Sequence, residues 1–167
     1  VPQEPVVVEP PSDRGVVSAP LFEPDPESID VQRGLLQGVS MELWLVNLLQ
    51  EGGVEGPQFE KMFGDYEAQL SDCMDQREKM LSRSQDTGSV ERALREARVY
   101  LEELKMRRSI GRASEEEYGV KARAIEWDIN NFEGVIFRKR SEVEFFEDPT
   151  RVVPVDEVNR LKEMAER

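Results

Sequence analysis

The sequence predicts an elongated, all-α fold of antiparallel helical hairpins, or a coiled coil, preceded by an extended proline-rich N-terminal segment. Two observations predict it. Apolar side chains recur at alternating intervals of four and three residues through three long segments, and one helix–turn–helix pattern occurs twice. Such spacing places apolar side chains in a narrow stripe along one side of a helix. We therefore expect the three segments to pack against one another along their stripes.

The repeated pattern covers residues 52–70 and 111–129, which align at a separation of 59 positions. Gly52 aligns with Gly111 and Phe59 with Tyr118. The apolar positions that follow also align, and they are Phe63, Tyr66 and Leu70 with Ala122, Ile125 and Ile129. Each copy has a glycine that ends one helix and an aromatic residue near the start of the next. This arrangement predicts two similar hairpins.

The N-terminal part, residues 1–34, contains seven of the ten prolines and seven acidic side chains against two basic ones. Proline interrupts helices and central strands, so we expect a disordered or extended acidic segment. A second interpretation stays open. The apolar groups Val6–Val8 and Val16–Val17, with Leu21 and Phe22, would then be anchors that order on a partner or along the helical body.

The helical body is expected to cover residues 35–147 and to contain four helices. A first short helix, Ser40–Glu51, is apolar nearly all round and is expected to be the most buried. The second helix is expected from Pro57 to Gln85, and the third from Val90 to Ile110 with Ser89 as its N-cap. Ser114 and Glu117 form a capping box that predicts the start of the fourth, which extends towards Phe145.

The C-terminal part, residues 148–167, begins with Asp148 and Pro149, which end the fourth helix. Asp156 is expected to cap a small last helix. This piece either packs on the body, docks on a partner or frays.

The stripes of the long helices predict an interaction seam through which the chain self-associates. Its gaps at Arg77 and Arg108 leave apolar surface that a second copy would cover. The seam residues with the clearest periodicity are Phe59, Phe63, Tyr66, Leu70, Leu94, Leu101, Leu104, Ile125, Ile129 and Phe132. The aromatic residues Trp44, Trp127, Phe132, Phe137, Phe145 and Phe146 are expected to belong to the core.

The composition bounds the chemistry that we expect. The chain has no histidine, a single cysteine and a net charge of −13. Histidine is the commonest general base and metal ligand, and an acidic chain repels nucleic acid. We therefore expect no catalytic residue, no cofactor, no metal site and no nucleic-acid partner. Cys73 lies on the seam and is expected to be a small core thiol, or a disulfide partner if that helix pairs with its own copy.

Basic residues cluster in two places and predict a docking patch or, alternatively, a solvated helix face. The residues are Lys105, Arg107, Arg108 and Arg112, then Arg138, Lys139 and Arg140. As a docking patch they would bind an acidic partner, the acidic N-terminal segment of another copy, or an anionic membrane.

The stretch from Leu101 to Tyr118 resembles helical hairpins of the CdvA-like coiled-coil family, which is associated with archaeal cell division. Its sequence is LEELKMRRSIGRASEEEY, and the preceding hairpin, Met41–Leu81, is similar in layout. The resemblance covers roughly residues 40–147 and implies a cytoplasmic scaffold that self-associates and recruits partners, without catalysis.

Two functions follow from these observations. The first is a non-enzymatic coiled-coil scaffold that forms a homo-oligomer, most simply a dimer, and recruits protein partners in the cytoplasm, touching a membrane only indirectly. The second is a monomeric helical adaptor or accessory subunit that docks on a larger complex through its tails.

Overall fold

The computed structural model describes residues 21–167, which form helices and connecting turns without a strand. The helices are α1 (Pro26–Gln50), α2 (Gly56–Gln85), α3 (Gly88–Ser109), α4 (Glu115–Glu147) and α5 (Val155–Ala165), with a 3-10 turn, η1 (Pro149–Arg151). The expected all-α class is confirmed for this part of the chain. The anchors expected at Val6–Val8 and Val16–Val17 lie outside the described residues. Of the other two, Phe22 packs against a buried cluster of the helical body and Leu21 is 91% exposed.

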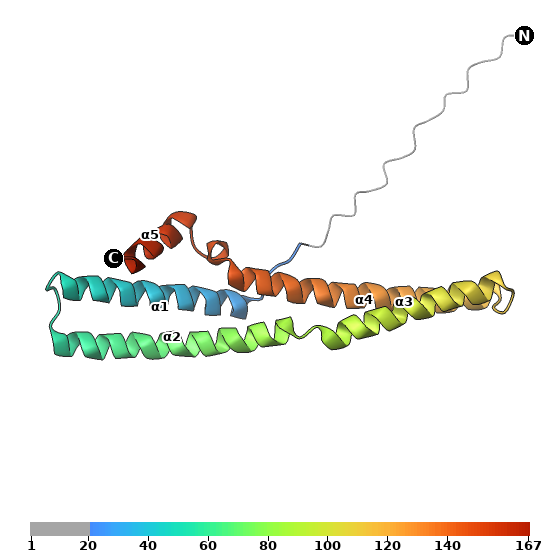
Figure 1. Ribbon diagram of the computed structural model, residues 1–167, viewed down its shortest axis with the longest axis horizontal. Coiled ribbons are helices and arrows are strands. Elements are labelled where there is room, and N and C mark those ends of the chain that lie inside the picture. The colour runs from blue at the N-terminus through green and yellow to red at the C-terminus, as the bar shows by residue number, and fades with distance from the viewer. Residues whose placement is uncertain (1–20) are drawn as a thin grey trace, which may run out of the picture.

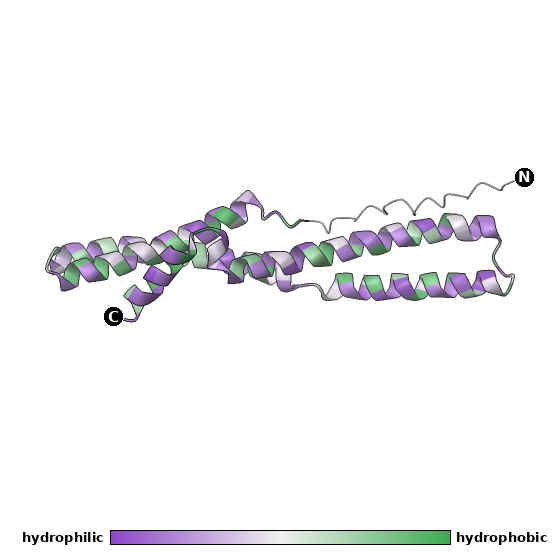
Figure 2. Cartoon of the chain, turned by 90° about the horizontal axis from the view of Figure 1, so that it is seen from above, coloured by the Kyte–Doolittle hydropathy of each residue, from purple (hydrophilic) through white to green (hydrophobic). Residues whose placement is uncertain are grey.

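The molecule is a rod with two arms (Figure 1). The first arm is α1 and α2, which lie side by side and run in opposite directions. The second arm is α3 and α4, which do the same on the other side of a short break at Asp86–Thr87. The first arm is seen flat in Figure 1 and the second in Figure 2, so the two helix layers are turned relative to each other about the rod axis.

The turns of the two arms have the same geometry, so the repeat seen in the sequence is also present in the backbone conformation. Gly52 and Gly111 adopt φ values of +72° and +74°. After each glycine a backbone amide donates a 2.8 Å bond to the carbonyl five residues earlier, from Gly53 to Leu48 and from Arg112 to Arg107. This bond and the left-handed glycine define a Schellman motif. The two turns therefore have the same backbone hydrogen bonds.

Each arm closes along its own apolar stripe. In the second arm Leu101, Leu104, Ala122 and Ile125 form a buried cluster between α3 and α4. In the first arm the residue 59 positions before Leu104 is Leu45, and both are fully buried, at 0% and 2% exposure. The position equivalent to Leu104 is therefore buried in the first arm as well.

Two glycines let α1 approach α2 closely. A Cβ atom built on Gly34 would lie 3.0 Å from Cys73 Sγ, and one built on Gly38 would lie 3.1 Å from Leu70 Cδ1. Because these glycines are four residues apart, they lie on one side of α1. The close contact explains why a helix of this length keeps two residues of low helix propensity.

The arms meet at a central junction formed by the start of α1, the end of α2 and the end of α4. With 33 residues α4 is longer than α3, which has 22, and its last turns pack on α2 and contact the start of α1 through side chains. Phe145 and Phe146 are buried there with Val31 and Met80. The junction therefore joins three helices, whereas each arm has two.

The expected start of the first helix was wrong. The helix begins at Pro26 instead of Ser40, so residues 26–34 are helical and belong to the body. Proline lacks an amide hydrogen and has a φ suited to the first helical turn, so Pro26 starts the helix instead of breaking it. The expectation that Ser40–Glu51 is the most buried segment was also wrong, because only Leu45 is buried there.

The helix caps agree with the sequence in part. Ser114 Oγ accepts a 3.1 Å bond from the Glu117 amide, as expected. The reciprocal half of the box is replaced by a bond from Lys121 Nζ to the Glu117 carboxylate. Two expected caps were wrong: α3 begins at Gly88, before Ser89, and α5 begins at Val155, before Asp156. The expected end at Asp148–Pro149 is confirmed, because α4 ends at Glu147.

The last helix, α5, packs back on α1 of the first arm. Val158 is buried, and Leu161 and Met164 on the same side are half-buried. Of the expected alternatives for this piece, packing on the body is the one observed.

The turn glycines give a first prediction. Gly52→Ala and Gly111→Ala should each lower the free energy of unfolding by about 1–2 kcal/mol, because a side chain disfavours the left-handed conformation. Gly64→Ala is the control. Gly64 lies inside α2 with nothing within 4 Å of an added Cβ, so this change should raise stability by about 0.5–1 kcal/mol. Urea unfolding followed by circular dichroism measures all three, and equal effects would contradict the assignment.

The equivalent leucines give a second prediction. Leu45→Ala and Leu104→Ala should each cost about 2–5 kcal/mol, since both remove a fully buried side chain from an arm. Met106→Ala, at a position that is 67% exposed on α3, should change stability by less than about 0.5 kcal/mol. Thermal and urea unfolding of the three variants makes the comparison. A small loss at only one of the two leucines would show that the arms are not packed alike.

Candidate functional site

The predicted seam lies inside the two arms. Leu94, Leu101, Leu104 and Ile125 are buried, and the other members are half-buried, namely Phe59, Phe63, Tyr66, Leu70, Ile129 and Phe132. Their partners are the helices of the same chain, because each arm closes on its own stripe. A second copy would reach this seam only if an arm opened. Any contact between copies that leaves both arms closed would use other surfaces.

Both arginines that interrupt the seam are placed on aromatic rings. The Arg108 guanidinium carbon lies 3.9 Å from the centroid of the Tyr118 ring, and that of Arg77 lies 5.9 Å from the Phe146 ring. A guanidinium over an aromatic face is attracted by the ring's electrons. The two gaps in the apolar pattern are thus filled within the chain, so they need no cover from a second copy.

Large apolar side chains on the second arm point away from its interior. The most exposed on α3 are Val99 and Met106, with Ile110 directly after its end, and the most exposed on α4 are Val120 and Trp127. Trp127 is 68% exposed, Trp44 47% and Phe137 41%, so the expectation that these three residues belong to the core was wrong. The sequence does carry a signal for Trp127. It belongs to a second stripe on α4, on the side opposite the stripe that the sequence interpretation used.

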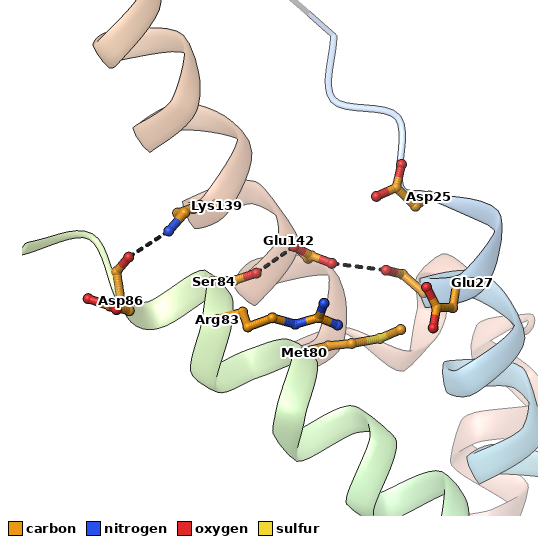
Figure 3. A pocket seen from close by; sticks show the side chains of 9 residues that line it. Asp25, Glu27, Met80, Arg83, Ser84, Asp86, Lys139 and Glu142 are labelled. Atoms are coloured by element: carbon orange, nitrogen blue, oxygen red, sulfur yellow. Dashed lines mark hydrogen bonds between the residues drawn. The ribbon is translucent and has the colours of Figure 1, made fainter. Parts of the chain in front are cut away.

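The central junction is held by one carboxylate. Glu142 of α4 accepts hydrogen bonds from Ser28 of α1, at 3.0 Å, and from Ser84 of α2 (Figure 3). Both serines are buried. Beside them Lys139 Nζ donates a 2.6 Å bond to the Asp86 carbonyl, at the break between the arms. These side chains line a cleft of about 500 Å³.

A second polar contact at the junction satisfies the backbone of α4 near its end. Gln32 Nε2 and Arg77 Nη2 both donate to the Phe146 carbonyl, at 3.3 and 3.1 Å. The last carbonyls of a helix have no partner within the helix, and a buried one is costly unless it is bonded. These two hydrogen bonds therefore position α4 on α1 and α2. The side chains of Gln32 and Arg77 have a structural role here.

The two basic clusters are not brought together. The first cluster lies at the turn between α3 and α4, and the second lies near the central junction, at the other end of α4. Several members are paired locally. Lys105 binds Glu102 at 2.9 Å, and Arg140 binds Glu91 at 3.1 Å. The hydrogen bond that Lys105 donates to the Glu102 carboxylate raises the pKa of Lys105. A single continuous docking patch is therefore not formed.

The arms differ in their charge. Every ion pair found among residues 21–167 lies in the second arm. Residues 26–85, which make up the first arm, hold eleven acidic side chains and five basic ones. Between Glu42 and Glu67 there are six acids and a single lysine, Lys61. Partial burial, and then the charge of Glu67, raise the pKa of Glu42. The first arm thus presents an acidic surface.

Cys73 is half-buried on α2 and faces Gly34 of α1. This position agrees with the expected core thiol, because its neighbours belong to the same arm. Among residues 21–167 no cluster of three or more histidine, cysteine, aspartate or glutamate side chains is arranged to hold a metal ion. No helix in that range is long and apolar enough to cross a membrane.

Comparisons of the chain with models of protein families, with curated proteins and with solved structures found no match.

The junction gives a third prediction. Glu142→Ala should lower the free energy of unfolding by about 1–3 kcal/mol, because it leaves the buried hydroxyls of Ser28 and Ser84 without their acceptor. Glu144→Ala removes an exposed carboxylate two residues away and should change stability by less than about 0.5 kcal/mol. Chemical unfolding of both variants is the measurement. Equal losses would mean that Glu142 does not link the three helices.

Proposed function

We propose that this chain is a non-enzymatic helical scaffold that pairs with a second copy of itself and recruits protein partners. One observation carries the proposal. The second arm exposes large apolar side chains on the outer sides of both its helices, although its inner stripe is already closed. Exposed apolar groups that gather along one element often mark a contact with another protein.

The shape of the arm supports such a contact. Two paired helices form a single layer, and a layer has two sides that its own chain leaves in water. Packed domains usually combine at least two layers around one core. A second copy adds the missing layer without any further sequence, and identical surfaces related by a two-fold axis are the commonest way to do so.

The first arm suits a different role. Its surface is acidic and carries no ion pair among residues 26–85. A surface of one charge sign attracts partners of the opposite sign and keeps like copies apart. We therefore assign recruitment of basic protein partners to the first arm and self-association to the second.

The resemblance to the CdvA-like coiled-coil family supports a cellular setting for such a scaffold. It favours a cytoplasmic assembly in archaeal cell division, with any membrane contact made through partners. The roles proposed for the two arms do not depend on archaeal cell division, because they are inferred from the charge and the exposed apolar side chains of each arm.

A monomeric adaptor is the second candidate, and α5 favours it. This short helix contacts α1 through a narrow apolar side, and clefts of about 380 and 320 Å³ remain beside it at Trp44. An adaptor would use this weakly held helix, or the N-terminal segment, to dock on a larger complex.

Mass measurement separates the two candidates and is the fourth prediction. Light scattering coupled to size-exclusion chromatography of residues 1–167 should give twice the 19.2 kDa chain mass, with dissociation on dilution. The dimer should persist at high salt, because apolar contacts are not screened by ions. A mass of one chain at every concentration would contradict the scaffold and favour the adaptor.

A further inference from the structure

We infer that two copies of this chain pair through the outer side of α4, antiparallel to each other, about a two-fold axis at Trp127. The inference rests on the proposed self-association and specifies which surface performs it. Its basis is a second stripe on α4, an unexplained glycine in that stripe and two charges placed symmetrically about Trp127.

The second stripe consists of Val120, Ala124, Trp127, Asn131 and Gly134, at intervals of four, three, four and three residues. Each residue turns an α-helix by about 100°, so this stripe lies on the side opposite the buried Ala122 and Ile125. Every member is exposed, with Val120 at 62% and Trp127 at 68%. The outer side of α4 thus has the period of a coiled-coil contact and no partner within residues 21–167.

Gly134 has no explanation in the packing of the single chain. A Cβ built there would meet nothing within 4 Å, as at Gly64 and Gly119, whereas Gly34 and Gly38 of α1 face side chains of α2. Of Gly64, Gly119 and Gly134, only the last lies in the outer stripe of α4. A glycine inside a helix costs about 1 kcal/mol relative to alanine. Close approach by a second helix is the use that α1 makes of its glycines. Close approach by a helix of a second copy would likewise account for Gly134 on the outer side of α4.

The large and small members of the stripe are complementary under a two-fold axis. Val120 and Gly134 lie seven residues before and after Trp127. In an antiparallel pair centred on Trp127, Val120 of each copy faces Gly134 of the other. The two indole rings meet at the axis, where aromatic pairs gain attraction beyond the area that they bury. The same surface therefore supplies the projecting side chain, Val120, and the recess that accepts it, at Gly134.

Charge selects the antiparallel orientation. Glu116 precedes Trp127 by eleven residues and Arg138 follows it by eleven, and both are exposed on the outer side of α4. Neither forms an ion pair among the described residues. Antiparallel pairing sets Glu116 of each copy opposite Arg138 of the other, twice in the dimer. Parallel pairing would place like charges together, which disfavours that orientation.

The outer side of α3 lacks these features and serves as the comparison. It exposes Val99, Met106 and Ile110, but Glu103 lies among them and the segment contains no glycine. The contact from Glu116 to Arg138 on α4 is roughly 33 Å long at 1.5 Å per residue. That length gives six turns of helix to the pairing surface.

The deciding experiment compares Trp127→Lys with Met106→Lys in the full chain. Both positions are exposed to the same degree, at 68% and 67%, on opposite helices of one arm. Sedimentation equilibrium should show a dissociation constant raised at least about thirtyfold by Trp127→Lys, as for a central tryptophan of an interface. Met106→Lys should change it less than about threefold, and circular dichroism should show equal helix content in both.

Charge exchange tests the orientation. Glu116→Arg and Arg138→Glu should each weaken the dimer, and the double variant should recover most of the wild-type affinity. Any loss from placing arginine at the start of α4 persists in the double variant, so recovery reports the contact between copies. A double variant weaker than both single variants would overturn the antiparallel pairing.

Gly134→Ala adds a test in which stability and association change in opposite directions. The variant should melt at a higher temperature when dilute, because alanine favours the helix, and should dimerise more weakly, because the added methyl group separates the helices. A dimer unaffected by Gly134→Ala and by Trp127→Lys would overturn this surface and leave the scaffold function standing. A wild-type chain that is monomeric throughout would overturn both.

Discussion

The contact of Glu142 with Ser28 and Ser84 is the constraint on which the shape of the molecule depends. The arms are joined in sequence only by the break at Asp86–Thr87, and a rod with one such link would bend there. Glu142 removes that freedom because it ties the end of α4 to the start of α1 and the end of α2. Phe145 and Phe146 then exclude water from the same place. The two arms consequently act as one rod, and surfaces at its two ends keep a fixed relation.

A rod of paired helices differs from a closed bundle in what it leaves exposed. A closed bundle shares one core among all its helices, whereas each arm here has a single internal stripe and two outer sides. The inner stripes are covered within the chain, since Leu45 and Leu104 are almost completely buried. The outer sides are free to differ between the arms without loss of the fold. Under the proposed scaffold function, this separation would let the contact with other proteins change independently of folding stability.

The local parts of this structure follow from the sequence, and the long-range parts do not. The glycine turns, the inner stripes and the boundaries of α2 depend on residues within a few turns of one another, so their spacing predicts them. The start of α1 was missed because proline has opposite meanings at the first turn of a helix and in its interior. The Glu142 contacts join residues 114 and 58 positions apart, and no local pattern marks such a pair. The outer stripe of α4 is present in the sequence. When a helix has two stripes, however, their spacing alone does not predict which one another helix of the same chain will bury.

The two arms have the same backbone geometry at their turns but different surface charges. This combination argues that the arms have different roles. Turns 59 residues apart keep the same left-handed glycine and the same hydrogen bonds, while the charges around them have diverged. In the second arm ion pairs neutralise the sides of the helices and leave the Val120–Trp127 side apolar. In the first arm six carboxylates and one lysine between Glu42 and Glu67 keep the surface acidic, and α5 covers part of its apolar side. In the proposed pairing through α4, repulsion between the first arms would keep them apart. The antiparallel pairing would therefore hold two acidic arms at opposite ends of the assembly, where each is open to its own partner.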